Sequence, residues 1–259
     1  MSKQYGDVRV ELRDYVAEVE MQRPPHNYFD VDLIRSLGDA FEDLDSNREC
    51  RALVLAAAGK SFCAGANLPA RGSGPADPQE MNPLYTEALR LFACRKPVVA
   101  AIQGAAVGGG LGVALVADFR VTCPEARFVA NFTRLGFHPG FGLSHTLPAL
   151  IGQQRAALMF YTGRRITGEQ AVAWGLADEL VERDGVRRQA HRLAAEIAAG
   201  APLAVESVRE TLRAGLHDKV RGATVREHQE QSWQRQTEDF REGVRAVNER
   251  RPGRFTGRR

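Results

Sequence analysis

Apolar and polar residues alternate at every second position near the start of the chain. The segments VRVEL (8–12) and VAEVEM (16–21) have this period, which predicts two strands joined by a turn at Arg13–Asp14. The segment RALVLAA (51–57) is instead a short, almost unbroken apolar run, which predicts a strand buried on both faces. The first part of the chain therefore contains strands of two kinds, half-buried and fully buried.

Segments in which apolar residues have helical spacing lie between these strands. Apolar residues recur every three or four positions across residues 29–45, which predicts an amphipathic helix with Asp30 as its N-terminal cap. Residues 84–97 predict a second helix, and residues 97–104 and 119–123 predict two more buried strands. Strands that alternate with helices indicate an α/β fold, in which helices pack on the outside of a sheet.

The second half of the chain has an almost wholly helical pattern. The predicted helices are residues 168–176, 186–200, 202–216 and a long one at 223–249. Between the two halves of the pattern, residues 69–83 are rich in glycine, proline and polar side chains. We interpret 69–83 as a loop over the fold and not as a linker between domains, because the helical pattern resumes directly after it.

The uncharged stretch 98–117 is about as long as a membrane span. Its glycines, Gln103 and the Lys96–Pro97 pair before it argue against that interpretation. A buried strand, a glycine turn and a buried helix account for it better.

Composition narrows the classes of function. The 259 residues fit one α/β domain, and a net charge of +3 is too small to indicate a nucleic-acid-binding protein. The arginine-rich end 248–259 is either a solvated or interface segment or an anion-binding arm. The four cysteines form no CxxC pair, so neither a metal site nor a disulfide framework is expected. The N-terminus has no apolar signal core, and we therefore expect a cytoplasmic protein.

The glycines Gly108–Gly110 stand between a strand-like run and a helix-like run. Such a turn leaves backbone N–H groups unpaired at the start of the helix, where they attract negative charge. The stretch matches neither of the common phosphate-binding glycine motifs. Phosphate binding, a packing cluster or an oxyanion hole remain open from the spacing alone. The turn at 59–68 exposes a second N–H, at Ala66, but the spacing does not show that the two donors meet.

Five segments, taken in this order, carry a resemblance to a known family. They are RALVLAAAGKSFCAGANL (51–68), RKPVVAAIQGAAVGGGLGVALVADFRV (95–121), ARFVANFTRLGFHPGFGLSHTLPALIG (126–152), TGEQAVAWGLADELV (167–181) and EDFREGVRAVNERRPGRFTGR (238–258). Together they resemble the enoyl-CoA hydratase/isomerase, or crotonase, superfamily. The resemblance implies a spiral of ββα units over residues 1–200, followed by a helical oligomerisation region at 201–259.

The same resemblance implies the partners. We expect an acyl-CoA thioester as substrate, with coenzyme A as part of it, and neither a tightly bound cofactor nor a metal. We expect no nucleic-acid or membrane partner, and assembly as a homotrimer or a dimer of trimers. The backbone N–H groups of Ala66 and Gly109 would hold the thioester oxygen. The residues expected to line the path of the substrate in this turn are Lys60, Ala64, Asn67 and Leu68.

The chain departs from the family at the positions that carry acids. The two glutamates that hydratases use correspond to Gly112 and Phe132, and a third carboxylate position of some relatives corresponds to Gly140. All three are expected to line the substrate site. Without the carboxylates we expect an isomerase, hydrolase, decarboxylase or carbon–carbon lyase in preference to an efficient hydratase. The alternative is a catalytically degenerate subunit that binds acyl-CoA.

Other side chains would then have to move protons. Histidine suits general acid/base catalysis, so His138, two positions before Gly140, is the first candidate, although it also fits a hydrogen-bonded loop histidine. Tyr85, on the helix after the loop, is the second, with a packing aromatic as the other interpretation. Asn131 is a candidate for hydrogen bonding to the acyl group, or an ordinary turn residue.

Overall fold

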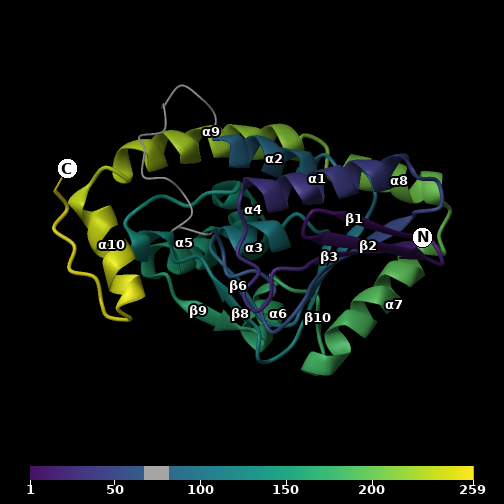
Figure 1. The fold of residues 1–259 in the computed structure, drawn as a ribbon, viewed down its shortest axis with the longest axis horizontal. Coiled ribbons are helices and arrows are strands. Elements are labelled where there is room, and N and C mark those ends of the chain that lie inside the picture. The colour runs from purple at the N-terminus through teal and green to yellow at the C-terminus, as the bar shows by residue number, and fades with distance from the viewer. Residues whose placement is uncertain (67–81, 259) are drawn as a thin grey trace.

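A seven-stranded sheet runs through the middle of the computed structural model, which describes residues 1–66 and 82–258 (Figure 1). In spatial order its strands are β1 (Ser2–Tyr5), β2 (Val8–Arg13), β3 (Val16–Met21), β4 (Ala52–Ala57), β5 (Val98–Ile102), β7 (Phe119–Thr122) and β10 (Glu179–Leu180). The pairs β1–β2 and β2–β3 are antiparallel, and every later pair is parallel. Parallel neighbours need crossover connections, which the helices provide.

A second sheet of three strands lies beside the first. It consists of β6 (Ala105–Val107), β8 (Arg127–Val129) and β9 (Arg165–Thr167), with β6 parallel to β8 and β9 antiparallel to it. The helices are α1 (Val31–Ser46), α2 (Pro83–Phe92), α3 (Gly109–Ala114), α4 (Leu143–Ile151), α5 (Gln153–Thr162), α6 (Gly168–Trp174), α7 (Val186–Ala198), α8 (Pro202–Leu212), α9 (Leu216–Gln234) and α10 (Glu238–Asn248). Two 3₁₀ turns, η1 (Phe132–Leu135) and η2 (Arg183–Gly185), complete the described elements.

Helices cover both faces of the large sheet. Figure 1 shows α7 on one side, where it packs on β3, β4, β5 and β7, and α1, α2 and α9 on the other. α9 packs on α2 and on α4, so a helix from the end of the chain covers elements from its middle. This arrangement brings residues of α9 to the region where the candidate site residues lie.

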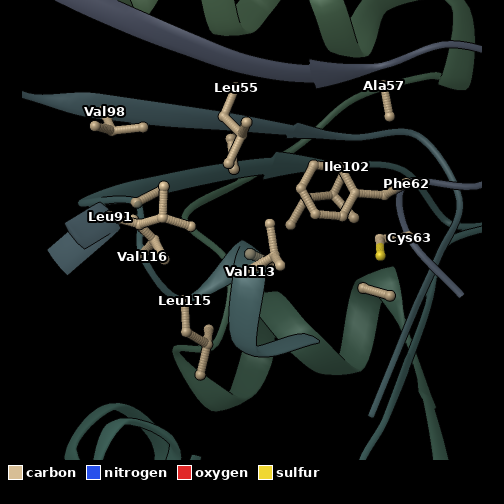
Figure 2. Close-up of a cluster of buried hydrophobic side chains, with 14 of the residues drawn as sticks. Leu55, Ala57, Phe62, Cys63, Leu91, Val98, Ile102, Val113, Leu115 and Val116 are labelled. Carbon is tan, nitrogen blue, oxygen red and sulfur yellow. The ribbon is translucent and has the colours of Figure 1, made fainter. Parts of the chain in front are cut away.

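The core between β4, β5 and α3 is apolar throughout. Figure 2 shows Leu55 of β4, Val98 and Ile102 of β5 and Val113 of α3 in one cluster, all fully buried. Strands covered on both faces need no polar side. This explains why β4 and β5 appear in the sequence as unbroken apolar runs.

Most of the predicted elements are confirmed. β2 and β3 form the expected hairpin, with a turn at Asp14 and Tyr15, both at positive φ. Asp30 caps α1 by accepting a hydrogen bond from the N–H of Leu33 (2.9 Å). The uncharged stretch 98–117 forms β5, β6 and α3, and no helix of the described ranges is long and apolar enough to cross a membrane.

The long helix predicted at 223–249 is wrong. α9 ends at Gln234 and α10 begins at Glu238. Thr237 causes the break, because its hydroxyl caps α10 by accepting from the N–H of Phe240 (3.1 Å). Several strands of two to four residues were not predicted, because they are too short to show a period.

The structure bears on two further predictions about the organisation of the chain. The loop expected at 69–83 lies almost entirely outside the described residues, which resume at Asn82. Residues 202–248 are helical apart from short turns, in agreement with the helical region expected after residue 200. The boundary between 1–200 and 201–259 stays a prediction.

Candidate active site

Two glycine-containing turns meet beyond the carboxyl ends of β4 and β5. The N–H of Cys63, in the first turn, donates to the carbonyl of Ala105 (2.9 Å), and the N–H of Val107 donates to the carbonyl of Cys63 (3.0 Å). A Cβ added to Gly110, in the second turn, would lie 2.2 Å from the carbonyl oxygen of Cys63. The turns are therefore in backbone contact, which the sequence spacing left open.

The two predicted oxyanion donors belong to these turns. Ala66 pairs with Phe29, whose N–H donates to the carbonyl of Gly65 (3.0 Å), and Gly109 begins α3 after Gly108, which has a positive φ of 55°. Within residues 1–66 and 82–258, neither the N–H of Ala66 nor that of Gly109 has a hydrogen-bond acceptor. Two unpaired donors on adjoining turns are what an oxyanion hole requires.

Aromatic side chains close the space around the glycine turn. A Cβ added to Gly109 would lie 2.5 Å from Cζ of Phe29, and one added to Gly112 would lie 2.7 Å from Cβ of Phe141. The rings of Phe29 and Phe141 meet edge to face, with centroids 5.7 Å apart. Position 112 therefore accepts only glycine while Phe141 occupies the neighbouring space.

Asn131 and Phe132 lie against the same turn. A Cβ added to Gly108 would be 3.5 Å from Oδ1 of Asn131 and 3.8 Å from Cζ of Phe132. Phe132 is buried and packs edge-on against Phe137, with ring centroids 5.6 Å apart. At this position the chain presents a ring and not a carboxylate.

Tyr85 and Gly140 come together from distant parts of the chain. A Cβ added to Gly140 would lie 2.2 Å from the hydroxyl oxygen of Tyr85. The hydroxyl thus occupies the space of a side chain at 140 and donates to Oε1 of Gln231 (2.9 Å). Nε2 of Gln231 donates to the carbonyls of His138 (2.9 Å) and Pro139 (3.2 Å). The sequence analysis missed Gln231, which no motif marks.

His138 faces a different space from Tyr85. Its ring Nδ1 lies 2.9 Å from the carbonyl of Pro139, and its backbone N–H donates to Oε1 of Gln234 (2.6 Å). The half-buried ring lines a hollow of about 430 Å³ together with Phe160 and Tyr161. Since a carbonyl accepts hydrogen bonds, Nδ1 carries the proton and Nε2 is the basic nitrogen. The role of His138 as a proton carrier stays a prediction.

Glu227 on α9 is a fully buried carboxylate that the sequence analysis also missed. It accepts hydrogen bonds from the N–H of Gly142 (2.8 Å), the N–H of Ser144 (2.9 Å) and the Ser144 hydroxyl (2.6 Å). Burial raises the pKa of the Glu227 carboxyl, and this outweighs the hydrogen bonds, which lower it. Glu227 fixes the start of α4 and the loop that carries His138.

The raised pKa of Glu227 predicts a pH-dependent contribution to stability. The folded state holds this proton more tightly than the unfolded state, so the contribution is present at low pH and is lost as pH rises through the raised pKa. In Glu227→Gln one carboxylate oxygen becomes an amide NH2, which cannot accept the hydrogen bond from a backbone N–H. The unpaired groups should lower the free energy of unfolding by about 1–3 kcal/mol. We expect the stability advantage of the wild type over this variant to shrink as the pH rises from about pH 4 to about pH 8.

Urea denaturation across that pH range measures the difference. Glu196→Gln, at an exposed position of α7, is the matched control and should show no comparable trend. An advantage that grows with pH would contradict the raised pKa.

Two further predicted residues, Lys60 and Ala64, lie in the first turn. Lys60 is exposed, and its carbonyl accepts from Nη2 of Arg183 (3.1 Å), while the N–H of Ala64 donates to the carbonyl of His26 (2.9 Å). Asn67 and Leu68 lie outside the described residues. Cys63 is buried, which raises the pKa of its thiol to about 12, so it packs as a small apolar residue and is no nucleophile.

The comparison with protein families identifies the family of the chain. Residues 11–258 match the family described as enoyl-CoA hydratase/isomerase. The chain belongs to this family. Members act on CoA thioesters, and the α/β architecture with C-terminal helices is that of the crotonase fold, as expected from the resemblance.

Individual relatives extend over nearly the whole chain. A Rhodobacter capsulatus protein named as a probable enoyl-CoA hydratase is 32% identical, over 98% of this chain and 99% of its own. The Mycobacterium tuberculosis protein EchA14, also named as a probable enoyl-CoA hydratase, is 38% identical over 82% of this chain and 83% of its own. The crystal structure of an enoyl-CoA hydratase/isomerase from Pseudoalteromonas atlantica superimposes with a TM-score of 0.88 at 27% identity, covering 96% of this chain and all of that one.

Proposed function

We propose that this enoyl-CoA hydratase/isomerase family member stabilises a thioester enolate between the N–H groups of Ala66 and Gly109. Removal of a proton from the carbon next to the thioester moves negative charge onto the carbonyl oxygen. Fixed backbone donors stabilise that charge without reorganising, and one such donor is typically worth about 3–4 kcal/mol of barrier. The observation that carries the proposal is the backbone contact between the two turns, each with an unpaired N–H among the described residues.

The proposed reaction is one other than efficient hydration. Hydration needs one group to activate water and another to protonate carbon. Gly112 and Phe132 offer neither, and Phe141 fills the space beside Gly112. Isomerisation, decarboxylation or carbon–carbon cleavage would proceed through the same enolate, and hydrolysis would place the same negative charge on the oxygen of a tetrahedral intermediate, which the two donors would stabilise in the same way.

Tyr85 is the proton carrier that the contacts favour. Its hydroxyl lies against Gly140, at a position that holds a carboxylate in some relatives, and Gln231 fixes its orientation. His138 is the alternative, because its ring lines the hollow beside α5. A catalytically degenerate subunit that only binds acyl-CoA is the second candidate function, and the aromatic filling around Gly112 favours it.

Assembly into a homotrimer or a dimer of trimers is part of the proposal. Helix α8 exposes Leu203 and Leu212, each 81% accessible, along with Val208. Leu203 and Leu212 lie on opposite sides of this helix, and large apolar side chains left in water are candidates for contact with another chain. The helices after residue 200 would therefore form the contact between copies, in a cytoplasmic enzyme.

Ligand-induced stabilisation tests the proposed substrate class. A ligand that binds only the native state raises the melting temperature. We expect acyl-CoA thioesters at about 100 times their Kd to stabilise the protein by about 2.7 kcal/mol, which calorimetry and thermal shift both detect. Acetylated pantetheine without the nucleotide serves as the control and should bind more weakly. A panel of acyl-CoAs of varied chain length that produces neither heat nor a thermal shift would overturn the assignment.

A further inference from the structure

One face of α9 carries three polar side chains toward Tyr85. His228, Gln231 and Arg235 are spaced by three and four residues, so they lie on the same side of the helix. The His228 ring meets the Tyr85 ring edge to face, with centroids 6.4 Å apart. Nη2 of Arg235 donates to Oε1 of Gln231 (3.0 Å), the atom that also accepts from the Tyr85 hydroxyl. Phenol and guanidinium therefore flank the same oxygen.

Two nitrogen atoms of this face are buried without a partner. His228 is only 6% exposed, and its Nε2 has no hydrogen bond within residues 1–66 and 82–258. Nε of Arg235 is also buried and unpaired in the same part of the chain. No carboxylate of the described residues pairs with Arg235, whereas Arg226 on the same helix pairs with Glu230 (2.8 Å). Buried polar atoms nearly always have partners, and among the described residues this face offers none to these two nitrogens.

Two aromatic rings lie between the Arg235 guanidinium and the glycine turn. It sits over the Phe137 ring, 5.4 Å from the centroid, and Phe137 packs on Phe132, which adjoins Gly108. The rings of Phe132 and Phe137 thus connect the glycine turn to the cation. A planar guanidinium suits a carboxylate best, because two parallel N–H donors match its two oxygens.

We propose that the acyl moiety of the substrate ends in a carboxylate, which Arg235 binds and to which His228 supplies a second donor. This inference rests on the proposed function, because it places the thioester at Ala66 and Gly109. It names the substrate class more narrowly, as a CoA thioester of a dicarboxylic acid. The carboxylate would give the unpaired nitrogens their missing acceptor.

Matched pairs of ligands test this inference. Succinyl-, glutaryl- and adipyl-CoA are each compared by calorimetry with the uncharged acyl-CoA of equal chain length. We expect the wild type to bind at least one carboxylated ligand about tenfold or more tightly than its uncharged counterpart. Arg235→Met keeps an unbranched apolar side chain but removes the charge, and should abolish the difference while leaving the uncharged ligands bound.

Arg226→Met is the control for loss of one positive charge from α9, and it should keep the preference. If Arg235→Met fails to fold, Arg235→Gln, which also removes the charge, replaces it. Equal binding of charged and uncharged ligands by the wild type, or a preference that survives in Arg235→Met, would overturn this inference and leave the proposed function standing. Absence of binding by any acyl-CoA would instead overturn both.

Discussion

Replacement of Gly110 by alanine is expected to lower the free energy of unfolding by about 3 kcal/mol and to abolish acyl-CoA turnover. The added Cβ would lie 2.2 Å from the carbonyl oxygen of Cys63, which itself accepts from the N–H of Val107. Backbone on both sides of this contact cannot move aside as a flexible side chain would. The two turns would have to separate, and the donors at Ala66 and Gly109 would separate with them.

Urea denaturation measures the loss of stability, and the acyl-CoA selected by the thermal-shift panel measures the loss of turnover. Gly222→Ala on α9 is the matched control, because nothing lies within 4 Å of its added Cβ. In a helix this exchange should be neutral or stabilising by up to about 1 kcal/mol. A Gly110→Ala protein as stable and as active as the wild type would show that the turns do not depend on this contact.

Replacement of Tyr85 by phenylalanine is expected to reduce turnover by about 10²-fold or more while acyl-CoA binding changes little. The variant keeps the ring that packs against His228 and loses only the hydroxyl beside Gly140. It also removes one hydrogen bond to Gln231, which should lower stability by about 1 kcal/mol. Steady-state kinetics with the selected acyl-CoA separates the effect on kcat from the effect on KM.

Two companion variants sharpen this experiment. Tyr161→Phe, at a position that is 79% exposed, controls for loss of a phenol elsewhere. His138→Gln keeps a polar side chain without a titratable ring. If turnover survives in Tyr85→Phe but falls about 10²-fold in His138→Gln, the proton carrier is His138.

Local features of the fold were predictable because nearby residues determine them. Asp30 caps α1 through a hydrogen bond to a residue three positions later, and the hairpin of β2 and β3 follows from the alternation of their side chains. The break between α9 and α10 was equally local, but the Thr237 cap lies inside a pattern that keeps helical spacing on both sides. Periodicity alone does not distinguish two consecutive helices from one.

The candidate site was predictable only in its backbone. The glycine and alanine positions of the two turns follow from the sequence, and the structure brings those turns into contact. The partners of Tyr85 were not predictable, because Gln231 and Arg235 come from a helix at the other end of the chain. Glu227 was not predictable either, because a glutamate on a polar helix is usually exposed, whereas this one is buried.

The contact between the two turns has a consequence for how activity in this chain can change. The atoms that join the turns, and the donors proposed to hold charge, are all main chain. The groups around them are the side chains of Tyr85 and Phe132 and two glycines, Gly112 and Gly140, which have no side chain. Charge stabilisation is therefore separable from proton transfer, and substitutions can replace the chemistry at the acyl group without rebuilding the part that binds its oxygen. The same framework can thus be retained through successive changes of reaction, provided that Gly110 and Cys63 stay in contact.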